Sequence, residues 1–296
     1  MGVIDIPFLR IVNSVFRLGK EKIMGYFSGK VAVVTGGASG IGEAIATELS
    51  LSGCVVVIAD INIDEAQRIA EALSRAGGRV FALAMDVTDK ESVQSVMDSV
   101  VDSYGQLDIM INNAGIVVIS EMEDTLEEDW DRLIDINLKG VVFGMQAAYK
   151  IMKQQGGGQI LNTASSSGLS PTPLFTAYSS VKHAVVGVST ATRVEAASYN
   201  IKVNALCPGV VNTPVATGRN TSRGMNLETL SGGLPMMLSP SRVAKAALKG
   251  MKKNKAIIPV GMDSYLPYWA NRFVPGVYDF LLIRGVPLIR NYMKSD

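Results

Sequence analysis

The stretch VAVVTGGASGIGEAIATELSLSGCVVVIAD, residues 31–60, decides the fold of this chain. It opens with a β-branched run at 31–35, passes through a glycine-rich turn, and reaches a second β-branched run at 54–60. Between the turn and the second run, IGEAIATELSLS at 41–52 has the periodicity of a helix. A strand, a helix and a strand in this order predict a βαβ unit with two parallel strands.

The same alternation continues along the chain. Four more β-branched runs predict strands at 79–86, 107–115, 158–165 and 201–209, with helical segments between them. The runs lack apolar/polar alternation, which is typical of strands buried on both faces of a parallel sheet. The predicted fold class is therefore α/β, a doubly wound parallel sheet of the Rossmann type in a single domain.

Two short extensions flank that domain. We assign the domain to residues 29–261 and the extensions to 1–28 and 262–296. FLRIVNSVFRLGKEK at 8–22 predicts a basic amphipathic helix, too short and too charged to span a bilayer. The stretch 264–294 mixes aromatic and basic residues, and its prolines should break it into short helices at most. Such segments suit peripheral contact with a membrane; the alternative is packing on the protein's own surface or on a second subunit.

Composition argues against several classes of function. The 296 residues are 48% apolar with a net charge of +1, so the chain can bury a large core but lacks the basic field of a nucleic-acid-binding protein. Cys54 and Cys207 lie far apart in apolar runs, and we expect reduced core thiols in a reducing, cytoplasmic compartment. The only histidine, His183, should point away from Lys182 on a helix, which argues against a Ser-His-Asp hydrolase. No residues have metal-ligand spacing, so no metal site is expected.

The glycine-rich turn TGGASGIG at 35–42 predicts a dinucleotide site. Gly36, Gly40 and Gly42 let the backbone turn tightly beside a pyrophosphate, and the next helix offers unpaired N–H groups at its N-terminus. Asp60 ends the second strand, where a carboxylate accepts hydrogen bonds from the adenosine ribose and repels a 2′-phosphate. Since ADINIDE around it contains no Arg or Lys, NAD is preferred over NADP.

Tyr178 and Lys182 form a candidate acid/base pair. They are four residues apart in AYSSVKHAVVGVSTATRVEAA, which predicts one helix with both side chains on the same face. A cation close to a phenol favours the phenolate and should lower the pKa of Tyr178. By itself this spacing is common on solvated helix faces, so its meaning depends on the residues around it.

Several motifs, in this order and spacing, resemble those of the short-chain dehydrogenase/reductase family over roughly residues 28–260. The motifs are TGGASGIG at 35–42, Asp86-Val87 after the third strand, NNAG at 112–115, Asn137 in DINLKG, Ser165 in NTASSSG, YSSVK at 178–182 and PGVVNT at 208–213. The resemblance implies an oxidoreductase that moves a hydride between a nicotinamide cofactor and a secondary alcohol or ketone.

The resemblance implies four catalytic residues: Asn137, Ser165, Tyr178 and Lys182. Tyr178 would exchange a proton with the substrate oxygen, and Lys182 would bind the nicotinamide ribose and lower the pKa of Tyr178. Ser165 would hold the substrate oxygen, a task that either of the next two serines could take instead. Asn137 would bend a helix around a water that links Lys182 to solvent; the alternative is that it only caps or packs.

A larger set of residues would hold the cofactor. Asp86 and Val87 would border the adenine, Asn113 would contact the adenosine ribose or lock the glycine-rich turn, and Val211 with Thr213 would meet the carboxamide. The expected set is Gly36, Ser39, Gly40, Ile41, Gly42, Asp60, Asp86, Val87, Asn113, Tyr178, Lys182, Pro208, Gly209, Val211 and Thr213.

Residues 215–239 take the place of the family's substrate-covering loop. They include Met225, Met236 and Met237, which suit an adaptable apolar pocket for a steroid-, terpenoid-, acyl- or aromatic-type substrate, although a mobile surface loop is an alternative. The leading function is an NAD-dependent alcohol dehydrogenase or ketone reductase. The alternative is a weakly or non-catalytic NAD-sensing module that presents its hydrophobic termini to a membrane or protein. By analogy with the family, helices at about 124–153 and 176–198 would pair subunits into a homodimer or homotetramer.

Overall fold

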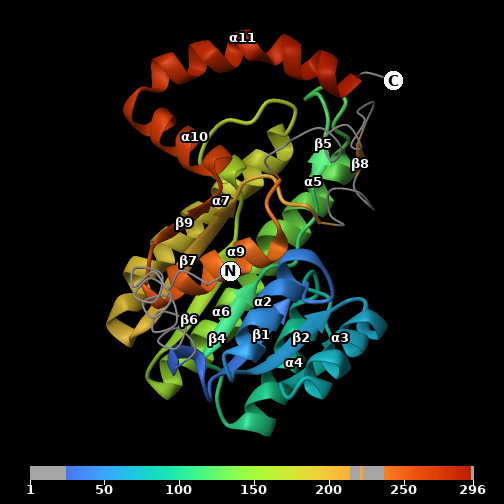
Figure 1. Ribbon diagram of the computed structural model, residues 1–296, viewed down its shortest axis with the longest axis vertical. Coiled ribbons are helices and arrows are strands. Elements are labelled where there is room, and N and C mark those ends of the chain that lie inside the picture. Colours follow the sequence, from blue (N-terminus) through green and yellow to red (C-terminus); the bar gives the residue numbers. More distant parts are fainter. Residues whose placement is uncertain (1–24, 214–220, 223–236, 295–296) are drawn as a thin grey trace, which may run out of the picture.

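The protein is represented by a computed structural model that describes residues 25–213, 221–222 and 237–294. The amphipathic helix predicted at 8–22 and most of the loop at 215–239 lie outside the described residues. Within the described parts, Figure 1 shows a sheet with helices on both sides and two further helices at one end of the molecule.

A parallel sheet forms the centre of the domain. Its strand order is β3-β2-β1-β4-β6-β7-β9, and every neighbouring pair is parallel. The strands are β1 (Val31–Thr35), β2 (Val55–Asp60), β3 (Arg79–Ala84), β4 (Ile109–Asn112), β6 (Gly158–Thr163), β7 (Ile201–Pro208) and β9 (Ile257–Val260). The strand order reverses between β1 and β4, and ligands bind at such a point in doubly wound sheets. The α/β fold class predicted from the sequence is confirmed.

One strand of this sheet was not expected from the sequence. β9 (Ile257–Val260) has four residues and contains Pro259, which cannot donate to a ladder. It lies at the edge of the sheet beside β7, where one side of the strand needs no partner.

Helices cover both faces of the sheet, and each face has its own core. α2 (Gly40–Leu51), α3 (Ile63–Arg75) and α9 (Pro240–Lys252) pack on one face. α4 (Lys90–Tyr104), α6 (Gly140–Gln155) and α7 (Thr176–Ala196) pack on the other. Successive side chains of β1 serve the two cores in turn: Val34 belongs to the first and Val33 to the second. This explains why the β1 sequence is apolar without alternation.

The long helix expected at about 124–153 is divided. It begins as α5 (Glu127–Ile134), widens into the π-helical segment η1 (Asp135–Lys139), and continues as α6. Acidic residues fill the first turn of α5, where they complement the positive end of the helix dipole. Short elements complete the described chain: β5 (Val118–Ile119), which pairs with β8 (Thr221–Ser222), and the 3₁₀ turns η2 (Ser166–Gly168) and η3 (Ala197–Tyr199).

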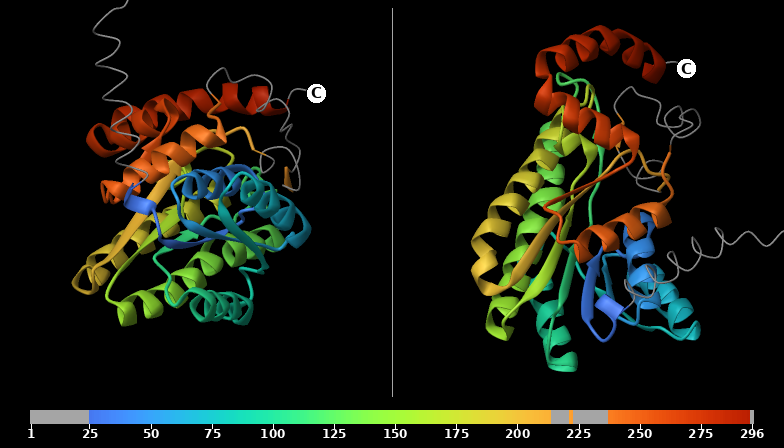
Figure 2. Two further views of the ribbon diagram at one scale, coloured as in Figure 1. Left: turned by 60° about the horizontal axis from the view of Figure 1, so that its bottom comes forward. Right: turned by 60° about the vertical axis from the view of Figure 1, so that its left-hand side comes forward.

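The expectation that prolines break the C-terminal stretch into short helices is wrong. α10 (Met262–Phe273) continues through Pro267, and α11 (Pro275–Lys294) is a 20-residue helix that contains Pro287. A proline inside a helix removes one backbone hydrogen bond and bends the axis, but a long helix keeps its other bonds. Figure 1 shows α11 as a curved helix, and both views in Figure 2 place it with α10 at one end of the molecule.

Candidate functional site

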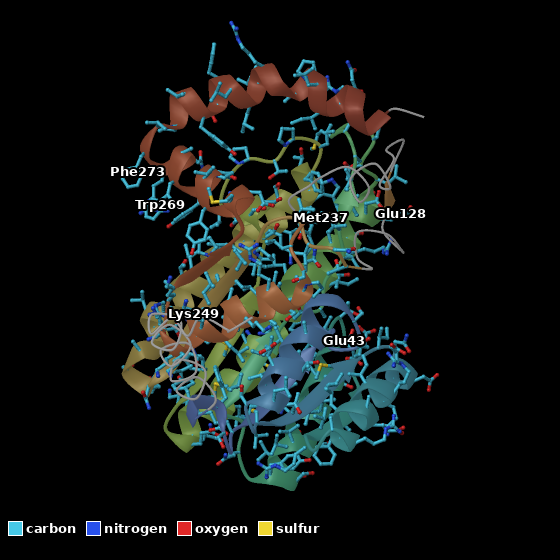
Figure 3. The ribbon with its side chains drawn as sticks, viewed as in Figure 1. Glu43, Glu128, Met237, Lys249, Trp269 and Phe273 are labelled. Atoms are coloured by element: carbon cyan, nitrogen blue, oxygen red, sulfur yellow. The ribbon has the colours of Figure 1, made fainter. Side chains whose placement is uncertain are left out.

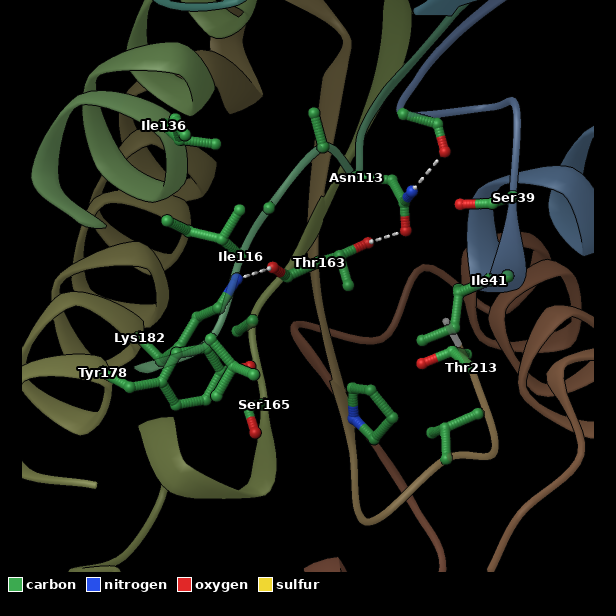
Figure 4. Close-up of a pocket in the computed structure, with 18 of the residues that line it drawn as sticks. Ser39, Ile41, Asn113, Ile116, Ile136, Thr163, Ser165, Tyr178, Lys182 and Thr213 are labelled. Carbon is green, nitrogen blue, oxygen red and sulfur yellow. Dashed lines mark hydrogen bonds between the residues drawn. The ribbon is translucent and has the colours of Figure 1, made fainter. Parts of the chain in front are cut away.

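A cavity of about 1050 Å³ lies at the carboxyl ends of the strands, around the point where the strand order reverses. Figure 4 shows its central part. Most of the residues predicted from the sequence line it: Gly36, Ser39, Gly40, Ile41, Asp60, Asp86, Val87, Asn113, Ser165, Tyr178, Lys182, Pro208, Gly209, Val211 and Thr213. Gly42 and Asn137 are not part of its wall.

The glycine-rich turn is folded against the strand beside it. Gly36 has φ +61°, which favours glycine, and a Cβ there would lie 2.7 Å from the Cα of Ala114. Gly42 packs on the same turn, since a Cβ on it would overlap the carbonyl oxygen of Gly36. The Asn113 side chain donates to the carbonyl oxygens of Thr35 and Gly36, each at 3.1 Å. These two bonds hold the glycine-rich turn in place, which is one of the two roles considered for Asn113.

The turn presents the N-terminus of α2 to the cavity. Ser39 occupies the N-cap position, yet its side chain makes no capping hydrogen bond, and it lines the cavity together with Gly40 and Ile41. In Figure 4 the Ser39 side chain points from the start of α2 toward the cavity. The first N–H groups of a helix lack partners within the helix and carry partial positive charge, so this end suits an anionic group.

Two carboxylates border the cavity at the ends of strands. Asp60 accepts from the backbone N–H groups of Ala38 at 3.0 Å and Asn62 at 2.9 Å, which ties the end of β2 to the glycine-rich turn. Asp86 accepts from both the backbone N–H and the hydroxyl of Thr88, at 2.9 and 2.7 Å. Among the described residues, Lys182 is the only basic side chain in the cavity wall. Near Asp60, the described cavity wall therefore offers no basic side chain that could bind a 2′-phosphate.

A chain of hydrogen bonds joins Lys182 to the glycine-rich turn. The buried Nζ of Lys182 donates to the carbonyl oxygen of Thr163 at 2.9 Å. The Thr163 hydroxyl donates to Oδ1 of Asn113 at 3.3 Å, and Asn113 in turn holds the turn backbone. Figure 4 shows these bonds as a continuous path across the site. Two motifs some 140 residues apart in the sequence are thereby held in one arrangement.

Tyr178 lies one helical turn before Lys182 on α7, as predicted. The Nζ of Lys182 is 5.5 Å from the centre of the Tyr178 ring, which also makes an edge contact with Phe175. The expected lowering of the Tyr178 pKa is not seen in the protein alone. Burial raises the pKa of Tyr178 to about 12, and a hydrogen bond with Ser165 offsets only part of that rise. Burial also lowers the pKa of Lys182 to about 8. Desolvation by burial is the largest cause of both shifts.

Ser165 is the serine that lies beside Tyr178. It directly precedes η2, and its Oγ accepts from the backbone N–H of Ser167 at 3.2 Å while interacting with the phenol. Ser166 and Ser167 also line the cavity, but Ser167 accepts a hydrogen bond from Thr172 at 3.1 Å. The geometry therefore favours Ser165 for contact with a group next to Tyr178.

Asn137 lies outside the cavity wall, in the π-helical segment η1. Its side chain is fully buried, accepts from the Ile116 backbone N–H and donates to the Ile116 carbonyl oxygen, both at 2.8 Å. Gly115 brings the backbone close, because a Cβ there would lie 2.9 Å from Oδ1 of Asn137 and 3.6 Å from Nζ of Lys182. The helix widens into a π-helical turn at Asn137, and the two bonds to Ile116 give this side chain the packing role considered as its alternative; its part in a water-linked proton path stays a prediction.

Several residues of the site are not predicted by the sequence analysis. Thr163, Phe175 and Ile289 line the cavity, and Asp263 holds the loop after β7 through the backbone N–H of Val210. The position of Thr163 has a detectable signal, because it lies near the end of the strand predicted at 158–165, two residues before Ser165. Ile289 and Asp263 have none, since they lie in the C-terminal extension and reach the site only through the packing of α10 and α11.

Comparison with known sequences identifies the family to which the chain belongs. A profile of the short chain dehydrogenase family matches residues 30–224. An uncharacterised oxidoreductase of Staphylococcus aureus is 37% identical over 228 residues, which cover 77% of this chain and 93% of the relative. The chain belongs to the short-chain dehydrogenase/reductase family and is an oxidoreductase of that family.

Solved structures agree with that assignment. The 3-ketoacyl-(acyl-carrier-protein) reductase of Brucella melitensis, complexed with NADH, superposes with a TM-score of 0.70 at 29% identity, covering 80% of this chain and 98% of its own. A family member from Burkholderia phymatum in complex with NAD gives a TM-score of 0.74 at 25% identity, covering 91% and 98%. Both similarities extend over nearly the whole of the known protein.

Proposed function

We propose that the protein is an NAD-dependent oxidoreductase that interconverts a secondary alcohol and a ketone on a mostly hydrophobic small molecule. The observation that carries the proposal is the convergence of Tyr178, Ser165 and Lys182 in the wall of the same cavity that Gly36 and Asp60 line. A proton-transfer group and a dinucleotide cradle thus face one space, as alcohol and ketone chemistry requires.

The cavity fits a nicotinamide dinucleotide. The turn at Gly36 lets backbone approach a pyrophosphate at the start of α2, where a side chain would overlap neighbouring atoms. Asp60 is placed to accept from ribose hydroxyls, and Val211 and Thr213 of the loop after β7 also line the cavity. When bound, the nicotinamide would supply the hydride for reduction or accept it in oxidation.

The protein's own residues carry the proton. In ketone reduction the phenol of Tyr178 donates its proton to the substrate oxygen, and in alcohol oxidation the phenolate takes the hydroxyl proton. Ser165 donates a hydrogen bond to the same oxygen and stabilises alkoxide character, a contribution of about 3 kcal/mol when the donor is preorganised. Lys182, held by the Thr163 carbonyl, provides the positive charge near the phenol.

NAD is preferred over NADP in this proposal because Asp60 repels a 2′-phosphate. Its neighbours in the cavity wall are Ile61, Asn62 and Glu65, which offer no positive charge. The two structural relatives with bound NADH and NAD support the same choice.

The substrate end of the cavity is apolar. Its wall there includes Ile116, Ile119, Pro173, Phe175, Val210, Met237 and Ile289. Met237 is the one methionine of the predicted substrate loop that is described, and it lines the cavity; Met225 and Met236 lie outside the described residues. These side chains suit a ketone with a large hydrophobic body.

Turnover of NADH with a panel of steroid-, terpenoid-, acyl- and aromatic-type ketones tests the proposal. Tyr178→Phe should lower kcat by about 10²- to 10⁴-fold, because the proton donor is removed, and should change NADH binding far less than kcat. Tyr149→Phe makes the same chemical change on α6 outside the cavity wall and should retain full activity. Equal rates for Tyr178→Phe and the unmodified protein would contradict the assigned role. NADH binding without turnover of any ketone would favour a sensing module instead.

A further inference from the structure

We propose that α10 and the outward side of α11 form a docking surface for an anionic lipid membrane. We call this set of exposed side chains the C-terminal apolar surface: Met262, Leu266, Trp269 and Phe273 on α10, and Val277, Phe280, Leu281, Ile283 and Leu288 on α11. All nine are large apolar residues exposed to solvent in the described structure.

The α10 part is a single stripe. Met262, Leu266, Trp269 and Phe273 are spaced four, three and four residues apart, so they share one side of the helix. Phe273 is 70% exposed and Leu266 61%. The Trp269 and Phe273 rings stack on each other with centroids 5.3 Å apart, and Figure 3 shows both directed away from the body of the protein. Rings already ordered lose little further conformational freedom when they bind.

On α11, apolar residues occur on two sides. Tyr278, Leu282 and Val286 are partly buried and recur at helical spacing, which defines the side turned toward the protein. Phe280, Ile283 and the other members of the C-terminal apolar surface are exposed. A helix that is apolar on both sides normally has a second apolar environment in addition to its own domain.

Charge favours an anionic partner. Arg272 and Arg284 are exposed among the apolar side chains, and Arg284 lies over the Phe280 ring at 4.4 Å. The acidic residues of α10 and α11 are Asp263, which is engaged by the Val210 backbone, and the exposed Asp279. Aromatic rings beside arginines match the boundary between acyl chains and phosphate headgroups.

A membrane fits these features better than a second copy of the chain. A symmetric pair formed through this surface would bring Arg272 and Arg284 of both copies into one apolar contact, with only Asp279 to compensate them. A lipid surface accepts the apolar side chains and leaves each guanidinium beside a phosphate. In the described ranges no helix is long and apolar enough to cross a bilayer, so the contact would lie along the interface.

Docking would also bring the substrate end of the cavity close to the lipid. Ile289 of α11 lines the cavity, and Arg290 beside it donates to both carboxylate oxygens of Glu121, which fixes this end of the helix to the domain. The helix that faces the lipid is therefore also a wall of the substrate end. This consequence rests on the proposed function: a hydrophobic ketone or alcohol dissolved in the bilayer would have a short path into the cavity.

Flotation of the full-length protein with vesicles tests the docking surface. Phosphatidylcholine vesicles that contain phosphatidylglycerol should carry the protein upward, and vesicles of phosphatidylcholine alone should carry less. Trp269→Ser combined with Phe273→Ser should weaken partitioning at least about tenfold, because two large apolar side chains no longer enter the lipid. Arg272→Gln combined with Arg284→Gln should remove most of the dependence on phosphatidylglycerol.

Matched variants separate docking from general surface effects. Leu51→Ser combined with Val194→Ser removes two residues that are 60% and 78% exposed on α2 and α7, and it should not change partitioning. Unchanged flotation of both the α10 variant and the arginine variant would place lipid binding outside the C-terminal apolar surface and overturn the proposal. A fully soluble unmodified protein would also overturn it. The proposal would also fail if the unmodified protein bound no vesicles and light scattering showed that Trp269→Ser/Phe273→Ser converts a dimer into a monomer. The surface would then be a contact between two subunits. Because flotation uses neither cofactor nor substrate, its result is independent of the proposed catalytic function.

Discussion

The carboxylate of Asp263 accepts a hydrogen bond from the backbone N–H of Val210 at 2.6 Å. This bond joins the first turn of α10 to the loop after β7. The neighbouring Gly209 has no side chain, and a Cβ there would overlap the same carboxylate. The second oxygen, Oδ1, is buried without a hydrogen-bond partner among the described residues. A carboxylate that is desolvated for one short bond indicates that this loop position depends on it.

We therefore expect Asp263→Ala to weaken NADH binding by about tenfold, since a hydrogen bond to a charged group stabilises by about 1.5–3 kcal/mol and the loop carries Val211 and Thr213. Asp263→Asn keeps an oxygen acceptor and should bind almost normally. The dissociation constant, measured by NADH fluorescence, decides the matter. If Asp263→Ala binds NADH as the unmodified protein does, the loop is held by other contacts.

The pKa values of the buried pair predict different pH dependences for the two reaction directions. With a Tyr178 pKa of about 12, the phenol stays protonated near neutral pH, so ketone reduction should be flat there. Alcohol oxidation uses the phenolate, whose fraction rises about tenfold per pH unit below the pKa. Above about pH 8 Lys182 loses its proton, and reduction should fall while the rise in oxidation levels off.

Profiles of kcat/KM against pH in both directions measure this effect. The sign is set by burial, which disfavours the charged form of each group: it raises the pKa of the phenol and lowers that of the ammonium. A reduction rate that already declines below neutral pH would show that Tyr178 ionises much earlier in the working enzyme.

Alanine substitutions at two glycines should change the free energy of unfolding in opposite directions. Gly42→Ala places a Cβ against the carbonyl oxygen of Gly36 and the side chain of Asn113, and should lower the free energy of unfolding by about 1–3 kcal/mol. Gly187→Ala, in the interior of α7 with open space around it, should raise that free energy by about 0.5–1 kcal/mol. Urea unfolding of the two variants measures the difference. Equal stabilities would mean that the turn at Gly36 relaxes at little cost.

Adjacent residues of α11 provide a test of the cavity wall. Ile289 lines the cavity and is 36% exposed, whereas Leu288 is 74% exposed and lies outside the wall. Ile289→Ala should raise KM for large hydrophobic ketones about 3- to 10-fold through lost apolar contact, and Leu288→Ala should not. KM for NADH should stay constant in both variants. Identical substrate KM values for the two would exclude α11 from the substrate end.

Much of the fold could be predicted because its signals are local. The β-branched run at 31–35, the turn after it and the helical period at 41–52 follow one another within 22 residues. β9 was missed because four residues with a central proline carry little strand signal, and only the neighbouring β7 makes the segment a strand. The C-terminal helices were misjudged because the cost of a proline depends on how many other backbone bonds the helix keeps.

In the candidate site, too, some features follow from local sequence and others depend on the whole fold. The spacing of Tyr178 and Lys182 placed them on one helix face, but their pKa values depend on burial, which spacing does not contain. Thr163 accepts a hydrogen bond from Lys182 through its backbone carbonyl. Every residue type carries such an oxygen, so the identity of the residue at 163 does not predict this contact.

The sequence alone determined the α/β class, the glycine-rich turn, Asp60 at the end of β2 and the helical Tyr178-Lys182 pair. Each depends on residues that are close along the chain, where periodicity and turn preference act directly. Only the tertiary structure decided that Asp263 holds the loop at Val210, that Arg290 reaches Glu121 and that Ile289 lines the cavity. Those contacts join segments far apart in sequence, and packing of whole helices against the sheet brings them together.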